Sequence, residues 1–377
     1  MNGRLASLDA LRGFDMLFIM GLGGLVTSLC VALGWGSDCW LAAQMQHPSW
    51  LGLTQRDTIF PLFLFIAGIS FPFSLAKQRE NGLSTARILL RIARRLALLV
   101  LLGMVYERFF ASDARAFRYG SVLARIGIAW AAAAVMQVFL GIRARVAVAA
   151  AILVGYWALN VFVGAPDHPG AGHFTPEGNI AVYIDRTYLA SWCRISPGTK
   201  ALPFDNQGLL STLPAIVTAM LGVFTGEYVR GTRGRVSGDR QSLCMLVVAA
   251  LLAVAGCIIA WGLGPWSFPF SKVLWSPSFL LVVAGYSLGL FALFYWLIDV
   301  RGIWKRTLFF RVIGMNSIAI YLAQPVLNFH RANEFLFGRL AGLFPQHWNA
   351  VVLGTFYVAF CWCFVYVLYR QKLFLKV

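Results

Sequence analysis

Long apolar segments, separated by short polar ones, follow one another along almost the whole chain. A helix needs about 20 apolar residues to cross the hydrocarbon core of a bilayer. Ten segments have roughly that length, and they lie near residues 12–34, 57–76, 92–111, 121–141, 146–163, 208–229, 241–262, 277–298, 307–329 and 349–369. The pattern predicts an all-α, polytopic membrane protein with about ten transmembrane helices, built as a single domain over residues 1–377. The longest connection, at about 164–206, is predicted to form an outside loop.

The composition agrees with a chain that lies mostly in lipid. Hydrophobic residues make up 59% of the chain, charged residues make up 12%, and the mean hydropathy is +0.71. Soluble domains are nearer half apolar and a quarter charged, so a soluble protein is excluded. Asp9 and Asp15 interrupt the basic N-terminal segment, and no small-residue cleavage site follows. We therefore expect the first apolar segment to be retained as a helix rather than removed as a signal peptide.

The positive charge predicts an orientation across the membrane. The net charge is +17, but the basic residues cluster between apolar segments and form no soluble basic face of the kind that nucleic acids bind. Lysine and arginine favour cytoplasmic loops. Placing the N-terminus inside puts most of the 32 lysines and arginines, and both termini, in the cytoplasm. All histidines then fall in outside loops: His47, His168, His173, His330 and His347.

The segment HPSWLGLTQRD, from His47 to Asp57, brings titratable side chains to the start of a long apolar run. Thr54 and Asp57 fit a capping box that begins a helix. In a second interpretation, Asp57 orients the imidazole of His47, which is basic enough to accept a proton near neutral pH. Trp50 is typical of a membrane-interface anchor, and it is also a candidate for contact with a substrate.

The seven cysteines show no metal-binding spacing, and neither do the outside histidines, so no metal site is predicted. Cys39 and Cys193 both fall in predicted outside loops. A disulfide between them in an oxidising compartment stays open, because spacing alone does not show that they meet.

Five segments occur in an order that resembles a known family. They read SLDALRGFDM, HPSWLGLTQRDTIFPLFLFIAGIS, GNIAVYIDR, FDNQGLLSTLPAIVTAMLGVFTGEYV and IGMNSIAIYLA. Together they resemble the heparan-alpha-glucosaminide N-acetyltransferase family and its bacterial relatives, from about residue 5 to 370. The H-x-x-W-x-G-x-x-x-x-D-x-x-F-P and G-M-N-S-I segments are the most specific parts.

This resemblance implies a multi-helix transmembrane enzyme that takes acetyl from cytosolic acetyl-CoA and delivers it to an amino sugar on the far side of the membrane. It also implies that His47 is catalytic. By its chemistry, Asp57 is the candidate to hold the His47 imidazole. The chain departs from the family in the length of its first outside loop, GWGSDCWLAAQMQ, which is longer than in lysosomal members, and at two polar positions. Gly23 stands where the lysosomal members have a catalytic asparagine, and residues 205–208 read DNQG where many relatives have DPEG.

Acetyl-CoA carries phosphates, which arginine binds well. Four arginines with helical spacing are candidates, with positive-inside bias as the alternative explanation; they are Arg87, Arg91, Arg94 and Arg95. Arg125 is a further candidate because a charge inside a span usually faces a cavity or a partner. Asn316 and Ser317 are candidate hydrogen-bond donors to the reacting thioester.

Polar residues of the long outside loop are candidates for hydrogen bonds to a sugar, although ordinary loop polarity explains each of them equally well. They are Asn179, Asp185, Arg186 and Asp205. The leading hypothesis is an acetyl-CoA:amino-sugar N-acetyltransferase of the cell inner membrane, in contact with lipid and with a homodimer left open. The alternatives are a membrane transporter of amino sugars or related saccharides, and a non-catalytic relative that binds acyl-CoA.

Overall fold

The computed structural model describes residues 5–110, 120–189, 194–195, 203–204, 206–302 and 307–375. The predicted all-α fold is confirmed, since the described residues are helical except for loops and one antiparallel pair of two-residue strands, β1 (Arg194–Ile195) and β2 (Pro203–Phe204). In chain order the helices are α1 (Ala6–Leu17), α2 (Gly23–Ala32), α3 (Trp40–Gln44), α4 (Gln55–Glu80), α5 (Thr85–Phe110), α6 (Val122–Phe139), α7 (Ile142–Phe162), α8 (Ile180–Tyr188), α9 (Thr212–Thr232), α10 (Gly238–Cys257), α11 (Pro277–Phe294), α12 (Leu308–Met315), α13 (Ser317–Val326), α14 (Phe329–Ala341) and α15 (Gln346–Arg370).

Short irregular turns join or extend several of these helices. The π-helical turn Phe18–Leu22 links α1 to α2. Within it, Gly21 has a φ of 113°, a backbone conformation that residues with a side chain rarely adopt. Two further π-helical turns extend α10 and α11; they are Ile258–Gly262 and Tyr295–Val300. Gly264–Trp266 forms one turn of 3₁₀ helix. The first apolar segment is therefore a helix with a break at Gly21.

Eight helices in the described part of the chain are long and apolar enough to cross a membrane, and each coincides with one of the ten predicted spans. The two remaining spans differ for physical reasons. Helix α5 is long, but its arginines make it more strongly charged. The span predicted at 307–329 is interrupted at Asn316, where the backbone leaves the helical conformation between α12 and α13. The protein is thus a multi-pass membrane protein, but the count of ten helices is not confirmed.

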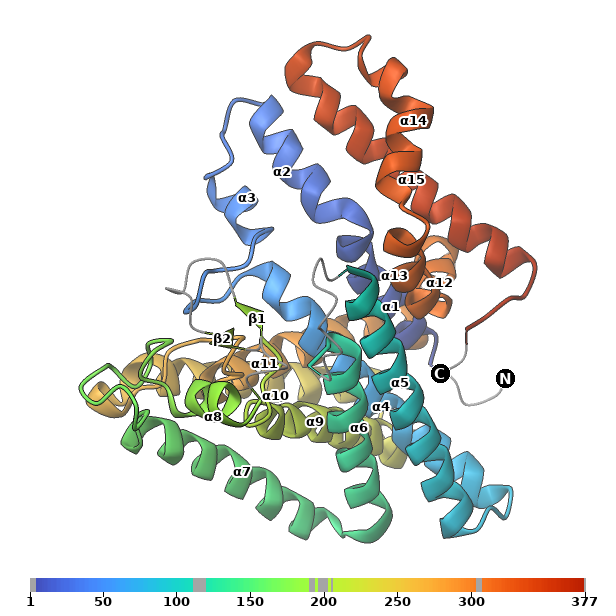
Figure 1. Ribbon diagram of the computed structural model, residues 1–377. Coiled ribbons are helices and arrows are strands. Elements are labelled where there is room, and N and C mark those ends of the chain that lie inside the picture. The colour runs from blue at the N-terminus through green and yellow to red at the C-terminus, as the bar shows by residue number, and fades with distance from the viewer. Residues whose placement is uncertain are drawn as a thin grey trace.

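Helix α14 was not expected, because its residues were assigned to an outside loop. It begins at Asn328, which has a left-handed backbone and a side chain that accepts a hydrogen bond from the Arg331 N–H at 3.3 Å. Helix α14 packs against α15, and α15 in turn packs against α2. In Figure 1 these three helices lie together at the top, apart from the bundle below them.

Helices α4 and α9 form the centre of the bundle (Figure 1). They are the most buried of the candidate spans, with 72% of each apolar window inside the protein. Glycines let the two backbones approach closely, because a Cβ on Gly222 would collide with the Phe65 carbonyl and one on Gly226 with the Ile69 carbonyl. Small residues spaced by four are the usual means of close helix contact in membranes.

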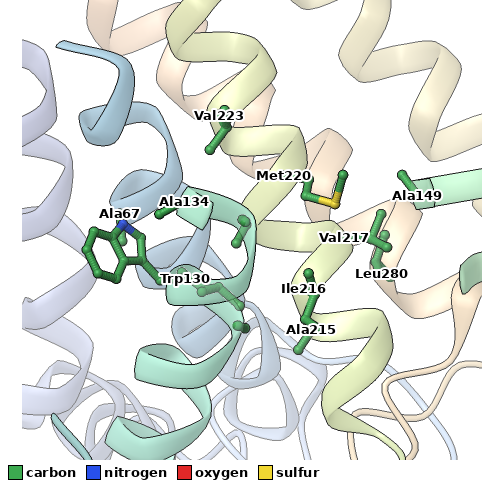
Figure 2. Packing of buried hydrophobic residues seen from close by; sticks show 14 of the residues in the cluster. Ala67, Trp130, Ala134, Ala149, Ala215, Ile216, Val217, Met220, Val223 and Leu280 are labelled. Carbon is green, nitrogen blue, oxygen red and sulfur yellow. The ribbon is translucent and has the colours of Figure 1, made fainter. Parts of the chain in front are cut away.

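Side chains from α4, α6, α7, α9 and α11 converge on this centre (Figure 2). Trp130 of α6 packs edge-on against Phe71 of α4, with ring centroids 5.5 Å apart. Ile216, Val217 and Met220 of α9 belong to the same buried cluster. Helix α4 is therefore fixed on one side by α9 and on another by α6.

Replacing Gly222 by alanine should destabilise the bundle, because the added methyl group has no space against the Phe65 carbonyl. Overpacking of this kind typically costs about 1–3 kcal/mol. Thermal unfolding of purified protein in detergent should show a lower midpoint. The matched control is Gly155→Ala in α7, where a Cβ meets no atom within 4 Å. Equal midpoints for the two variants would contradict the close-packing argument.

Candidate active site

Two loops that are far apart in the sequence are joined beside the start of α4. The Gly52 N–H donates to the Phe270 carbonyl at 2.8 Å, and the Ser271 hydroxyl donates to the Trp50 carbonyl at 3.1 Å. The Tyr156 hydroxyl of α7 donates to the Leu274 carbonyl of the second loop at 2.6 Å. These bonds bring residues 47–52 and 270–274 into one rigid surface.

His47, Asp57 and Lys272 meet at this junction. The Nδ1 atom of His47 lies 2.7 Å from Oδ1 of Asp57. The Nζ atom of Lys272 lies 3.4 Å from the same Oδ1 and 3.4 Å from His47 Nδ1. Asp57 is 1% exposed, whereas the His47 side chain is 47% exposed. A buried carboxylate thus holds an accessible imidazole and an ammonium group.

Asp57 makes the contacts that both interpretations of the sequence require. Its Oδ2 accepts the Thr54 backbone N–H at 3.3 Å and lies 3.1 Å from the Thr54 hydroxyl, as a helix-capping residue does. Its Oδ1 pairs with His47. Since an ionised carboxylate only accepts, the imidazole donates from Nδ1, which leaves Nε2 as its basic atom.

Lys272 was missed by the sequence analysis. Its partners are 215 and 225 residues away, so no local pattern links them. One signal was available, since a lysine in a predicted outside loop runs against the positive-inside bias. Burial lowers the pKa of Lys272, and the Asp57 carboxylate opposes this by favouring the charged form.

A cavity of about 750 Å³ extends from these residues between α1, α4, α5, α6 and α13. This volume is within the range of small-molecule sites. His47, Arg56 and Lys272 line it, and the Arg56 guanidinium is held by the Met45 carbonyl at 3.0 Å. Much of the remaining wall is apolar; it includes Met16, Ile19, Ile59, Phe60, Phe63, Leu99 and Ile126.

Two further arginines line the same cavity, Arg12 of α1 and Arg95 of α5. Arg12 donates to the Ser70 hydroxyl at 2.6 Å, and the Arg95 guanidinium lies 4.1 Å from the centre of the Trp130 ring. Ser70 is 13 residues beyond Asp57 on α4, which corresponds to a rise of about 20 Å. The cavity therefore has cationic groups at two well-separated levels.

The predicted arginine cluster is divided by the fold. Only Arg95 lines the cavity, whereas Arg87, Arg91 and Arg94 are exposed on α5. Arg125 does not line the cavity. It is buried, with its Nη2 donating to the Ser211 hydroxyl at 2.6 Å and to the Gly208 carbonyl at 3.3 Å.

Ser317 lines the cavity, and Asn316 is buried immediately before it. Neither the Oδ1 nor the Nδ2 atom of Asn316 has a hydrogen-bond partner among the described residues. A buried amide without partners costs free energy unless a ligand or water satisfies it. Asn316 is thus a polar group available next to the cavity wall.

The residues predicted to contact a sugar support the outside loops through contacts with protein. Trp50 donates to the Phe174 carbonyl at 2.7 Å, and Asn179 caps α8 by accepting the Ala181 N–H at 3.0 Å. Asp185 accepts the Leu209 N–H at 3.0 Å. Arg186 pairs with Asp167 at 2.8 Å from Nε, and this ion pair keeps the pKa of Asp167 below its usual range.

None of these sugar-contact candidates lines the cavity. Asp205 and Cys193 lie outside the described residues. In the described part of the chain, no three His, Cys, Asp or Glu side chains lie close enough together to hold a metal ion.

Gly23 lines the cavity, together with Gly21 and Gly24. A Cβ on Gly23 would meet only the Met45 side chain, at 3.7 Å, and one on Gly24 would meet nothing within 4 Å. The position where the lysosomal members are expected to have an asparagine thus opens into the cavity and has room for a side chain.

Comparison with known proteins supports the same family. A family model described as a domain of unknown function (DUF5009) matches residues 4–124. The chain is 27% identical to heparan-alpha-glucosaminide N-acetyltransferase of Homo sapiens over an alignment of 417 positions, gaps included. It is 27% identical to that of Mus musculus over an alignment of 421 positions, and both alignments cover 99% of this chain. The predicted resemblance is confirmed. The chain spans about 60% of the length of these N-acetyltransferases.

The chain is thus a multi-pass membrane protein that is similar over nearly all of its residues to two named N-acetyltransferases.

Proposed function

We propose that this protein is a transmembrane N-acetyltransferase that moves acetyl from cytosolic acetyl-CoA to the amino group of an amino sugar on the extracytoplasmic side. One observation carries the proposal. A single cavity is lined by His47, which pairs with the buried Asp57, at one level and by two arginines at another, about 20 Å away along α4. Such a cavity suits a long donor whose anionic end and reactive end bind at different depths.

In this mechanism His47 acts as a general base. An amino sugar is protonated at neutral pH and must lose a proton before it attacks. The Nε2 atom of His47 takes that proton, and Asp57 holds the imidazole in the required tautomer through Nδ1. The amine nitrogen then bonds to the thioester carbonyl carbon, and the carbon–sulfur bond breaks. CoA leaves as a thiolate, which takes up the second proton that the nitrogen loses as the amide forms. A route through acetylated His47 uses the same residues in two steps.

The developing negative charge on the carbonyl oxygen needs a preorganised donor. Asn316 and Ser317 are the proposed donors, supported by the unpartnered buried amide and by the place of Ser317 in the cavity wall. The proposed phosphate site is Arg12 with Arg95, since arginine binds phosphate through paired hydrogen bonds. Arg87, Arg91 and Arg94 then serve orientation alone.

The proposed setting is the inner membrane of a bacterial cell, with the chain acting as one transmembrane domain and a homodimer as a candidate assembly. The sugar is proposed to enter from the His47 side, near Trp50 and the outside loop that holds Asn179, Asp185 and Arg186. Transport of the sugar without acetylation is the competing outcome in the experiments below.

Replacing His47 by alanine should lower acetyl transfer to a glucosamine-like acceptor by about 100-fold or more, since a positioned base contributes about 10²–10⁴. CoA binding should stay unchanged, because the proposed phosphate site lies at the other level of the cavity. CoA release and CoA affinity measure the two effects. His347→Ala, at an exposed histidine, is the control. Transfer above about a tenth of the wild-type rate would refute the base assignment.

The double substitution Arg12→Gln with Arg95→Gln should weaken CoA binding at least tenfold, because a charge-assisted hydrogen bond contributes about 1.5–3 kcal/mol. The control is Arg87→Gln with Arg94→Gln, which removes the same charge from exposed positions of α5. Calorimetric titration with CoA compares the two variants. Equal weakening in both would show that general positive charge, and not the Arg12–Arg95 pair, attracts CoA.

Acetyl transfer should be vectorial. In sealed right-side-out vesicles, amino sugar supplied outside should be acetylated only when acetyl-CoA is loaded inside. In a background without native cysteines, Leu51→Cys should react with an impermeant maleimide in intact vesicles, and Glu80→Cys only after permeabilisation. The two sites flank α4, whose 26 residues are long enough to cross the membrane. Labelling of both from one side would refute the transmembrane mechanism, and uptake of unmodified sugar would favour a transporter.

A further inference from the structure

We propose that Lys272 is a positioning residue of the active site, whose ammonium group neutralises Asp57 and thereby keeps the His47 imidazole uncharged and ready to accept a proton. The inference rests on the proposed function for its catalytic meaning. Its electrostatic content concerns only the three side chains, and it can be tested without any substrate.

The geometry that supports this role is a shared acceptor. The His47 Nδ1 and Lys272 Nζ atoms approach the same oxygen, Asp57 Oδ1, at 2.7 and 3.4 Å. The two nitrogens are themselves only 3.4 Å apart. One negative charge is therefore opposed by the Lys272 ammonium group before His47 takes up any proton.

Lys272 is held in place by its loop. Ser271, directly before it, bonds to the Trp50 carbonyl and accepts the Leu274 N–H at 3.3 Å. Trp275, shortly after it, is fully buried and donates to the Thr218 hydroxyl of α9 at 3.0 Å. The backbone on both sides of Lys272 is thus anchored, which fixes the point from which its side chain reaches Asp57.

Two arginines add positive charge near Lys272. Arg56 of α4 lines the cavity beside His47, and both Arg56 and Arg125 of α6 act on Lys272 as like charges. Asp57 is the carboxylate that pairs with Lys272, and it raises the pKa that burial and the two arginines lower. The His47–Asp57 pair therefore lies in a surrounding of positive charge.

The consequence for His47 follows from the sign of each charge. An isolated Asp57 carboxylate at 2.7 Å would favour the protonated imidazole, and opposite charges at such distances shift a titration by one to three units. Lys272 acts in the opposite direction, since a neighbouring cation disfavours the imidazolium. Asp57 can then orient the imidazole through Nδ1 without trapping it in the protonated form.

The test compares Lys272→Met with Lys272→Arg, which keeps the charge. Titration of ¹³C-labelled histidines by NMR in detergent follows His47, whose signal is identified by its loss in His47→Gln. Lys272→Met should move the His47 titration to higher pH by about one unit or more, whereas Lys272→Arg should leave it near the wild-type position. Asp57→Asn should move it to lower pH.

The same variants should change the pH profile of acetyl transfer. Because only the neutral imidazole accepts a proton, activity falls as pH drops through the His47 titration. The acidic limb of the profile should therefore move to higher pH in Lys272→Met, so that the loss is largest near pH 6 and is partly recovered near pH 9. Lys272→Arg should restore the wild-type limb.

An unchanged His47 titration in correctly folded Lys272→Met, or a shift to lower pH, would overturn the proposal and leave Lys272 only a structural link between two loops. A shifted titration in a protein that transfers no acetyl would support the role of Lys272 and refute the proposed function instead. An active enzyme with an unshifted titration would do the reverse.

Discussion

The Asp57 carboxylate is the group on which both the site and the central helix depend. One oxygen closes the first turn of α4, and the other pairs with His47 and Lys272. A buried carboxylate is costly unless it is paired and hydrogen-bonded. Here the backbone of Thr54, the imidazole and the ammonium group together meet this requirement. The start of α4 and the position of the proposed base are therefore set by the same interactions.

Helix α4 connects the level of Asp57 to the level of Arg12. Gly68 faces α9, where a Cβ would collide with the Ala219 carbonyl, so that face of the helix is committed to close packing. Phe60, Phe63 and Ala67 face the cavity on another side. Helix α4 therefore packs against α9 on one face, and its other face forms a wall of the cavity that runs from the level of His47 to the level of Arg12.

Local patterns predicted the parts of the site that lie close together in the sequence. The spans follow from hydropathy. His47 and Asp57 are only ten residues apart in the sequence, so their pairing could be predicted from one short motif. Lys272 and Arg12 escaped prediction because they reach the site through tertiary contacts, at Asp57 and at Ser70. The arginines of α5 show the opposite error. Their helical spacing suggested one face, yet Arg95 turns toward Trp130 and the cavity while Arg87 and Arg94 stay exposed. Periodicity cannot tell which face of a helix its neighbours cover.

The roles of the polar residues in the outside loop could not be predicted, because the same residue types support loops and bind sugars. Asn179, Asp185 and Arg186 each bond to protein, and these contacts hold the outside loop against α7 and the start of α9. Tyr156 of α7 then bonds to the loop that carries Lys272. The outside loop is thus linked through α7 to the loop that carries Lys272.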